Sequence, residues 1–187
     1  MHYKKLLSLA FALSSCSLLP CQINDNFSDG DFNMNPTWSG STDVFVVNVS
    51  QELQLFNTTG GQSYLSTQTS NPSIDNKEWR FTVKQTFSGS DNNHSRIYLV
   101  ANGSDLSFSN STSGSNATGY FLKLGEAGSA DAIKFFRDDG PLGIVELAAG
   151  TLGLVASSFN INIQVLRDNV GNWSANIDPS GGTNFIS

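Results

Sequence analysis

Short runs of alternating apolar and polar residues, bounded by clusters of Gly, Asn, Ser and Asp, recur along most of this chain. The clearest run is EWRFTVKQTF, residues 78–87, in which aromatic and β-branched residues alternate with charged and polar ones. Successive side chains of a strand point to opposite faces, so this period of two predicts an antiparallel strand with one buried and one solvated face. The side chains expected on the buried face are those of Trp79, Phe81, Val83 and Phe87.

Beyond the first 21 residues, the chain contains further strand-like runs and almost no helical periodicity. The runs within 43–57 and 160–178 read as two hairpins, and those within 119–150 read as a three-stranded meander. At this spacing of strands, the sequence predicts an all-β fold, an antiparallel β-sandwich of the jelly-roll type. The polar segment 102–118 predicts a mobile surface loop. The individual runs are 43–49, 52–57, 63–68, 78–87, 95–101, 119–125, 132–138, 143–150, 160–168 and 172–178.

Residues 22–187 are expected to form a single lectin-like β-sandwich module, because about 165 residues are enough for one domain with its own core. The chain stops at TNFIS, residues 183–187, where another strand would begin. Sandwiches rarely leave the edge of a core sheet bare. We therefore expect the jelly roll to be truncated at its C-terminus and the chain to be a fragment of a longer protein.

The first 21 residues have the layout of a secretory signal peptide. A basic head with Lys4 and Lys5 precedes an apolar run, residues 6–13, that is too short to span a membrane. Two readings of its removal stay open. Residues 13–16, LSSC, fit a lipobox, in which a lipidated Cys16 would anchor the protein to a membrane. Ordinary cleavage would instead release the protein, so the predicted location is secreted or on the outer cell surface.

Cysteine content and charge exclude several classes of function. Both cysteines, Cys16 and Cys21, lie in the leader, so the exported part would have no disulfide, no cysteine zinc site and no cysteine nucleophile. Removing Lys4 and Lys5 from the 10 basic residues leaves 8 against 16 acidic ones, a formal net charge of −8. Nucleic acid is excluded as a partner, because phosphate binding needs clustered Lys and Arg. The acidic balance is compatible with divalent cations.

Residues 25–32, DNFSDGDF, place three aspartates and a glycine close together. They do not form an EF-hand, because Phe27 stands at a ligand position and Pro36 replaces the bidentate glutamate. In one reading, Asp29 and Asp31 are ligands of a looser calcium site completed by loop carbonyls. In the other, Asp29 begins a turn with the glycine after it, and Asp31 caps that turn by accepting hydrogen bonds from backbone amides.

Catalytic residues are sparse in this sequence. Glycoside hydrolysis is the enzyme class that such a sandwich most invites, and it needs two carboxylates facing one sugar bond. The pattern Glu-x-Asp-x-Glu that is typical of such enzymes does not occur, and His94 is the only histidine beyond the leader. We therefore expect the protein not to be an enzyme. Its glutamates are well separated in sequence, at Glu52, Glu78, Glu126 and Glu146.

Tryptophan rings stack on sugars and also fill protein cores, so a tryptophan in this chain can have either role. Trp79 alternates in phase with Phe81 and is expected in the core. For Trp38 and Trp173 both readings stay open, as core residues or as a ligand-binding platform. In the second reading, the two rings are expected to be exposed on one rim of the sandwich.

Several segments, taken in their order along the chain, carry a resemblance to a known family. They are DNFSDGDF, NPTWSG, FVVN, LQL, SYLST, WRFTV, FSGSDNN, RIYLVA, GYFLKLGEAGSADAIKFFR and VLRDNVGNW. Together they resemble the N-terminal module of large secreted Bacteroidota proteins, often named lamin tail domain-containing or gliding-associated, which the type IX secretion system exports. That module is similar in pattern to concanavalin A-like, laminin G-like jelly rolls. The resemblance runs from about Gln22 to the end of the chain.

The main functional hypothesis is a non-catalytic, secreted or cell-surface recognition module from a larger adhesin-like or lamin tail domain-containing protein. Its concave face or loop rim is predicted to bind an extracellular glycan or another cell-surface component, with calcium as the one candidate cofactor. The first alternative is a structural spacer without a ligand of its own. The second is a polysaccharide-degrading enzyme, which would need two carboxylates about 5 to 10 Å apart in a cleft.

Overall fold

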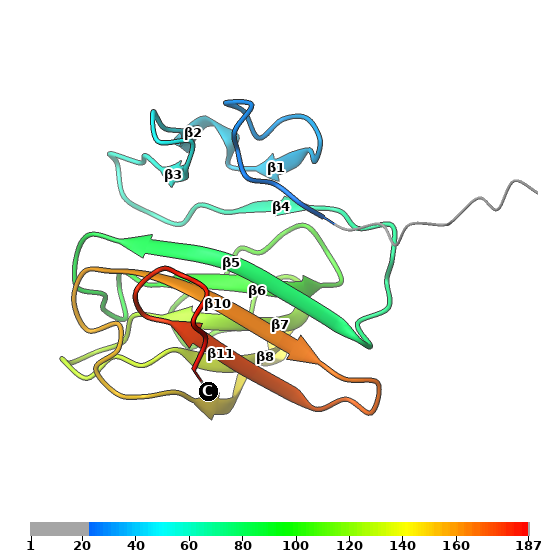
Figure 1. Cartoon of the computed structure of the whole chain (residues 1–187), viewed down its shortest axis with the longest axis vertical. Coiled ribbons are helices and arrows are strands. Elements are labelled where there is room, and N and C mark those ends of the chain that lie inside the picture. The colour runs from blue at the N-terminus through cyan, green and yellow to red at the C-terminus, as the bar shows by residue number, and fades with distance from the viewer. Residues whose placement is uncertain (1–22, 187) are drawn as a thin grey trace, which may run out of the picture.

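The computed structural model describes residues 23–186, which form an all-β protein whose paired strands run antiparallel, as the sequence predicts (Figure 1). The predicted signal peptide, residues 1–21, lies outside the described residues, and so does Cys16. Within residues 23–186, no helix has both the length and the apolar character needed to cross a membrane. The strands are β1 (Trp38–Gly40), β2 (Phe45–Val47), β3 (Leu53–Leu55), β4 (Leu65–Thr67), β5 (Lys77–Gln85), β6 (Ser95–Ala101), β7 (Thr118–Leu124), β8 (Lys134–Asp139), β9 (Ile144–Ala149), β10 (Phe159–Arg167) and β11 (Trp173–Asp178), with 3-10 turns η1 (Thr42–Val44) and η2 (Gly140–Leu142).

Two sheets make up the larger part of the protein, consistent with a β-sandwich. One has three strands in the order β11-β10-β5, and the other has four in the order β6-β7-β8-β9. The predicted meander is confirmed as β7, β8 and β9, and the predicted second hairpin as β10 and β11. Figure 1 shows the three-stranded sheet in front of β6, β7 and β8. The successive strands β5 and β6 belong to different sheets, so the turn between them, residues 86–94, crosses the sandwich.

The hydrophobic core lies between these two sheets. On β10, alternate residues Ile161, Ile163 and Val165 are buried, and they form one cluster with Leu122 and Leu124 of β7. Burying one such side chain contributes roughly 1.5–3 kcal/mol relative to leaving it exposed. The alternation that predicts the strands therefore also selects the side chains that hold the two sheets together.

Strand β5 confirms the predicted alternation over most of its length. Trp79, Phe81 and Val83 pack against the core, whereas the residues between them are exposed. The prediction was wrong for Phe87, whose side chain is 46% exposed. Gln85 takes the last inward position instead, and its Nε2 donates a hydrogen bond to the carbonyl of Phe87 at 3.0 Å. The strand ends at Gln85, so the period of two does not continue into the turn.

The N-terminal strands form two separate two-stranded ladders, β1 with β4 and β2 with β3. The predicted hairpin at 43–57 is present as β2 and β3, although each strand is shorter than its run. Figure 1 shows these strands grouped beyond β5, at one end of the molecule. Lys84 of β5 pairs with Glu52 at 3.3 Å, and the Ser66 hydroxyl donates to the carbonyl of Ser104 at 3.3 Å. Polar contacts thus attach this segment to both the three-stranded sheet and the β6–β7 loop.

Candidate ligand-binding site

The β6–β7 loop, residues 102–117, is organised by hydrogen bonds within itself. Phe108 and Ser115 form an isolated antiparallel bridge, and the backbone N–H of Asn116 donates to the backbone carbonyl of Ser107 at 3.1 Å. Ser115 is buried, with 2% of its surface exposed. The segment predicted as a mobile surface loop is therefore hydrogen-bonded within itself and, through the Ser115 amide, to Asp138 of the four-stranded sheet, whereas its mobility stays a prediction.

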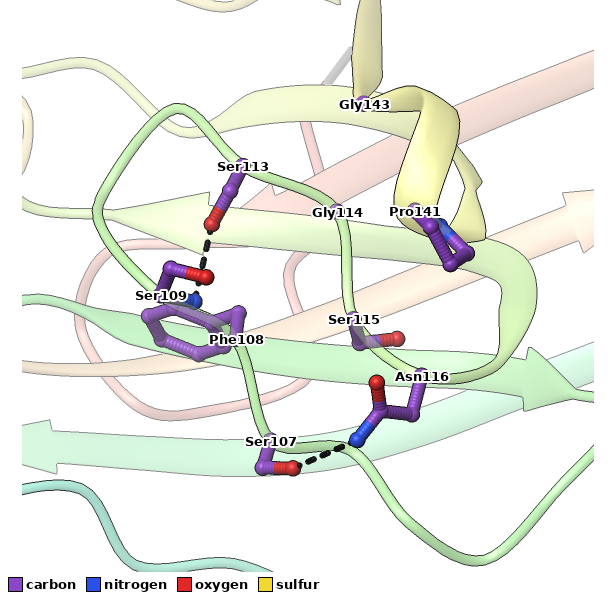
Figure 2. A pocket seen from close by; sticks show the side chains of 9 residues that line it. All are labelled: Ser107, Phe108, Ser109, Ser113, Gly114, Ser115, Asn116, Pro141 and Gly143. Carbon is purple, nitrogen blue, oxygen red and sulfur yellow. Dashed lines mark hydrogen bonds between the residues drawn. The ribbon is translucent and has the colours of Figure 1, made fainter.

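A cavity of about 500 Å³ lies between this loop and the β8–β9 turn (Figure 2). The loop supplies hydroxyls, the Asn116 amide and the ring of Phe108, whereas the turn supplies Pro141 and Gly143. None of these side chains carries a charge. The hydroxyls of Ser107, Ser113 and Ser115 and the Nδ2 of Asn116 already take part in hydrogen bonds of the loop. The neutral groups of the lining outside these bonds are the Ser109 hydroxyl and Asn116 Oδ1, beside the apolar ring of Phe108. The lining residues are Ser107, Phe108, Ser109, Ser113, Gly114, Ser115, Asn116, Pro141 and Gly143.

One buried carboxylate connects the two walls of this cavity. Asp138, at the end of β8, is 1% exposed and accepts hydrogen bonds from the Tyr98 hydroxyl at 2.6 Å, the Ser115 amide at 3.0 Å and the Gly140 amide at 2.8 Å. Ser115 belongs to the loop wall and Gly140 to the turn wall. Because a buried carboxylate needs several donors, Asp138 fixes the positions of both walls at once.

The Tyr98 hydroxyl donates to Asp138 in this network. Burial, and then the hydrogen bond to Asp138, raise the pKa of Tyr98 to about 12. The hydroxyl therefore keeps its proton at every pH at which the protein is expected to work. This makes Tyr98 a positioning residue and leaves no ionised phenolate beneath the cavity.

Gly114 lets the loop backbone touch the turn backbone at the edge of the cavity. A Cβ atom at this position would lie 1.9 Å from the carbonyl oxygen of Gly140 and 2.6 Å from Asp138 Oδ1. Side chains cannot approach a backbone atom this closely, so only glycine fits the position. The width of the cavity is therefore set by backbone contact.

Arg96 of β6 holds the ring of Phe108 in place. The Arg96 guanidinium carbon lies 3.7 Å from the centre of the Phe108 ring and 5.0 Å from that of Phe121 in β7. Arg96 also donates to the carbonyls of Asn110 and Ser111, each at 3.2 Å. Burial lowers the pKa of Arg96 from its ordinary value, but an arginine this basic stays charged. Phe108 is thus pinned between the sheet and the cavity by a cation–π contact.

The structure places Trp173 among other aromatic side chains between the sheets. Its ring stacks on Trp79 at 5.4 Å and lies 5.0 Å from both Tyr120 and Phe135. Trp38 lies in β1, where its Nε1 donates to Asp25 Oδ2 at 2.8 Å. Both sets of contacts are those of packing residues. The assignment of these two tryptophans to a ligand platform stays a prediction, and neither lines the cavity described above.

Asp29 and Asp31 lie in a turn whose hydrogen bonds match the capping reading. The amide of Gly30 donates to the carbonyl of Phe27 at 3.1 Å, and Asp29 Oδ1 accepts from the Asp31 amide at 3.4 Å. Asp31 Oδ1 accepts hydrogen bonds from the backbone amides of Asn33 at 2.8 Å and Met34 at 3.1 Å. The calcium role of these carboxylates stays a prediction. Among residues 23–186, no group of three or more His, Cys, Asp and Glu side chains is arranged to hold a metal.

The glutamates are not all isolated from one another. The ammonium of Lys134 lies 2.5 Å from Glu126 Oε2 and 3.5 Å from Glu146 Oε2. Because both oxygens contact the same nitrogen, the two carboxylates lie close to one another. The hydrogen bond that Lys134 donates to Glu126 is the largest cause that raises the pKa of Lys134. Both carboxylates are therefore paired with a cation, and neither lines the cavity. Glu52 and Glu78 pair separately, with Lys84 and Arg80.

Reasoning from the sequence missed Tyr98, Asp138 and Ser115, the residues that shape the cavity. One signal was available in the alternation of β8. Asp138 lies two residues after the buried Phe136, so the two side chains point to the same face and the carboxylate takes a buried position. The pairing of that carboxylate with a loop more than twenty residues earlier gives no local signal. Comparison of this chain with protein-family models, with curated proteins and with solved structures finds no match.

Proposed function

We propose that this chain is a non-catalytic recognition module that binds a neutral glycan in the cavity between the β6–β7 loop and the β8–β9 turn. The observation that carries the proposal is the uncharged lining of that cavity, in which the Ser109 hydroxyl and the side-chain carbonyl of Asn116 accompany the ring of Phe108. Sugar hydroxyls both donate and accept hydrogen bonds, as these groups do, and an aromatic ring packs against the apolar face of a sugar.

The rigid base of the cavity supports this proposal. Asp138 ties the two walls together through Tyr98, Ser115 and Gly140, and Arg96 fixes Phe108. A site that is already formed before binding loses less conformational entropy when a ligand enters. A short glycan gains little energy from each hydroxyl, so such preorganisation matters for its affinity.

The biological setting is also part of the proposal. The signal-peptide layout of residues 1–21 supports secretion or display on the outer cell surface. The antiparallel all-β fold and the ordered segments from DNFSDGDF to VLRDNVGNW support a concanavalin A-like, laminin G-like jelly roll from a larger adhesin-like or lamin tail domain-containing protein. On this reading, the module would hold its parent protein to extracellular polysaccharide.

A glycan array probed with the purified protein tests the proposal, followed by titration calorimetry on the best neutral oligosaccharide. Phe108→Ala should weaken binding at least about fivefold, because it removes the aromatic surface. Ser109→Trp should abolish binding by filling the cavity without removing a structural contact. Phe56→Ala is the matched control, since this phenylalanine is 63% exposed and lies outside the cavity. Absence of binding to all neutral glycans, or binding unaffected by both cavity variants, would contradict the proposal.

The carboxylates of Glu126 and Glu146 support one alternative, a polysaccharide-degrading enzyme, because they lie close to one another. Hydrolases place two such carboxyls about 5 to 10 Å apart, but one of them must carry a proton. Lys134 lies between this pair and is ion-paired with both carboxylates. Release of reducing ends from polysaccharides by the wild-type protein, and its loss in Glu126→Gln, would establish the enzyme reading.

A further inference from the structure

Asp131 lies in the loop between β7 and β8, and its side chain is completely removed from solvent, with 0% of its surface exposed. Neither oxygen of its carboxylate has a hydrogen-bond partner among the described residues. The two other aspartates with almost no exposure differ in this respect. Asp138 and Asp178 each accept hydrogen bonds from backbone amides.

Three loops meet around this carboxylate. Gly89 in the β5–β6 turn and Gly125 after β7 are so close that a Cβ atom at Gly89 would lie 2.6 Å from the Gly125 Cα. The same Cβ position is 3.4 Å from Asp131 Oδ2 and 3.4 Å from Gln85 Nε2. The carbonyl of Asp131 accepts a hydrogen bond from the Val155 amide at 3.3 Å, which brings in the loop after β9.

The neighbouring basic side chains are already paired with other acids. Lys134, three residues after Asp131, contacts Glu126 and Glu146, and Lys123 contacts Asp91 at 3.3 Å. An ionised carboxylate in a protein interior is strongly unfavourable unless a cation or several donors face it. The described residues supply neither to Asp131, so a ligand from outside the chain would complete the site.

We propose that Asp131 is the carboxylate ligand of a divalent cation of the calcium class, bound where the three loops meet. Calcium takes six to eight oxygen ligands in flexible geometry and uses backbone and amide carbonyls as readily as carboxylates. The remaining ligands would be backbone carbonyl oxygens of the three loops. Gln85 does not supply one, because its atom near this point is the amide Nε2, which donates to the carbonyl of Phe87. Magnesium keeps several of its waters, which a fully buried carboxylate disfavours.

This site differs from the one that the sequence predicts at Asp29 and Asp31. Those two carboxylates are exposed or half-buried and already accept hydrogen bonds from backbone amides. Asp131 has lost its contact with water without gaining a donor. Of these three carboxylates, Asp131 is therefore the one with most to gain from a cation. The inference does not depend on the glycan cavity.

Thermal unfolding of the purified protein tests this site, first in excess chelator and then in calcium. The midpoint should rise by about 5 to 10 °C when calcium is about 100 times its Kd, because the native state alone holds the ion. Asp131→Asn keeps the shape of the side chain and removes its charge. This variant should lose the calcium-dependent rise, and its midpoint in chelator should equal or exceed that of the wild type.

The double variant Asp29→Asn with Asp31→Asn is the matched control and should keep the full rise. If Asp131→Asn does not fold, Asp131→Glu provides the second test by titration calorimetry. It should change the calcium affinity at least about tenfold, because the longer side chain displaces the carboxylate in a closed site. The proposal is overturned if calcium does not shift the wild-type midpoint, if Asp131→Asn keeps the rise, or if Asp131→Glu binds calcium as the wild type does.

Discussion

The hydroxyl of Tyr98 on β6 donates to Asp138 on β8 at 2.6 Å, although β7 lies between these two strands. Gly119, which faces Asp138 in the register of β7 and β8, has no side chain that could separate the two groups. A Cβ atom at Gly119 would also lie 2.1 Å from the carbonyl of Val100. A contact across three strands thus sets the relative position of the two cavity walls.

Tyr98→Phe should lower the free energy of unfolding by about 1.5–3 kcal/mol, because it removes a buried hydrogen bond to a charged group. Urea denaturation at neutral pH measures the change. Tyr120→Phe is the matched control, since that ring packs on Trp173 at 5.0 Å without contacting Asp138, and its effect should be much smaller. Equal effects of the two variants would show that Asp138 does not depend on Tyr98.

Gly114→Ala should destabilise the protein by about 1–3 kcal/mol and weaken glycan binding. The new methyl group would collide with the carbonyl of Gly140 and force the loop away from the turn. Gly103→Ala in the same loop serves as the control, because its Cβ would meet only the Ala117 side chain at 3.4 Å. Unchanged stability and unchanged binding in Gly114→Ala would mean that the cavity walls are not held by this contact.

Stability at acid pH should depend on Asp105, in the first part of the β6–β7 loop. Hydrogen bonds from the Ser107 hydroxyl and then from Asn116 lower the pKa of Asp105 to about 2, from an ordinary value of 3.8. A folded-state pKa below the unfolded one means that this stabilisation is complete above about pH 4 and is lost as pH falls towards 2.

Denaturation between pH 5 and pH 2 should therefore show a shallower loss of stability in Asp105→Asn than in the wild type. The same replacement at the exposed Asp43 provides the control. Identical pH dependence in the wild type and in Asp105→Asn would contradict a stabilising role for this carboxylate in the loop.

Trp173→Ala should cost about 3 kcal/mol of stability, at the low end for a tryptophan because the ring is only partly buried. The loss follows from its contacts with Trp79, Tyr120 and Phe135. Trp38→Ala should cost less, since the ring neighbour of Trp38 is Phe27, at 6.4 Å. If either tryptophan is instead a ligand platform, its replacement will reduce glycan binding while leaving the unfolding midpoint unchanged.

The strands could be predicted from the sequence because each carries its own signal. In β5 and β10, inward and outward positions alternate within a few residues, and that alternation follows directly from strand geometry. Phe87 was misplaced because the pattern gives no sign of where the strand stops. Gln85 ends it through a hydrogen bond to the Phe87 carbonyl, which depends on the conformation of the turn.

The cavity and the buried carboxylates could not be predicted in the same way. Asp131 reads as an ordinary loop aspartate, and the alternation along β8 indicates only that Asp138 points inward, because the neighbours of both in space come from distant parts of the chain. Burial of Asp138 depends on Tyr98 and Ser115, and that of Asp131 on Gly89. Such contacts exist only after the two sheets and their loops have assembled.

The pairing of β5 with β10 has a consequence for how the chain folds. In that ladder, Trp79 stands opposite Val165, whereas the meander of β6 to β9 joins strands that follow one another. Contacts between residues far apart in sequence form slowly, because a long segment must be closed first. During synthesis, the meander can therefore assemble while both edges of β5 are unpaired. The edge that pairs with β10 is open to aggregation until β10 emerges, and a chain ending before Phe159 would never cover it.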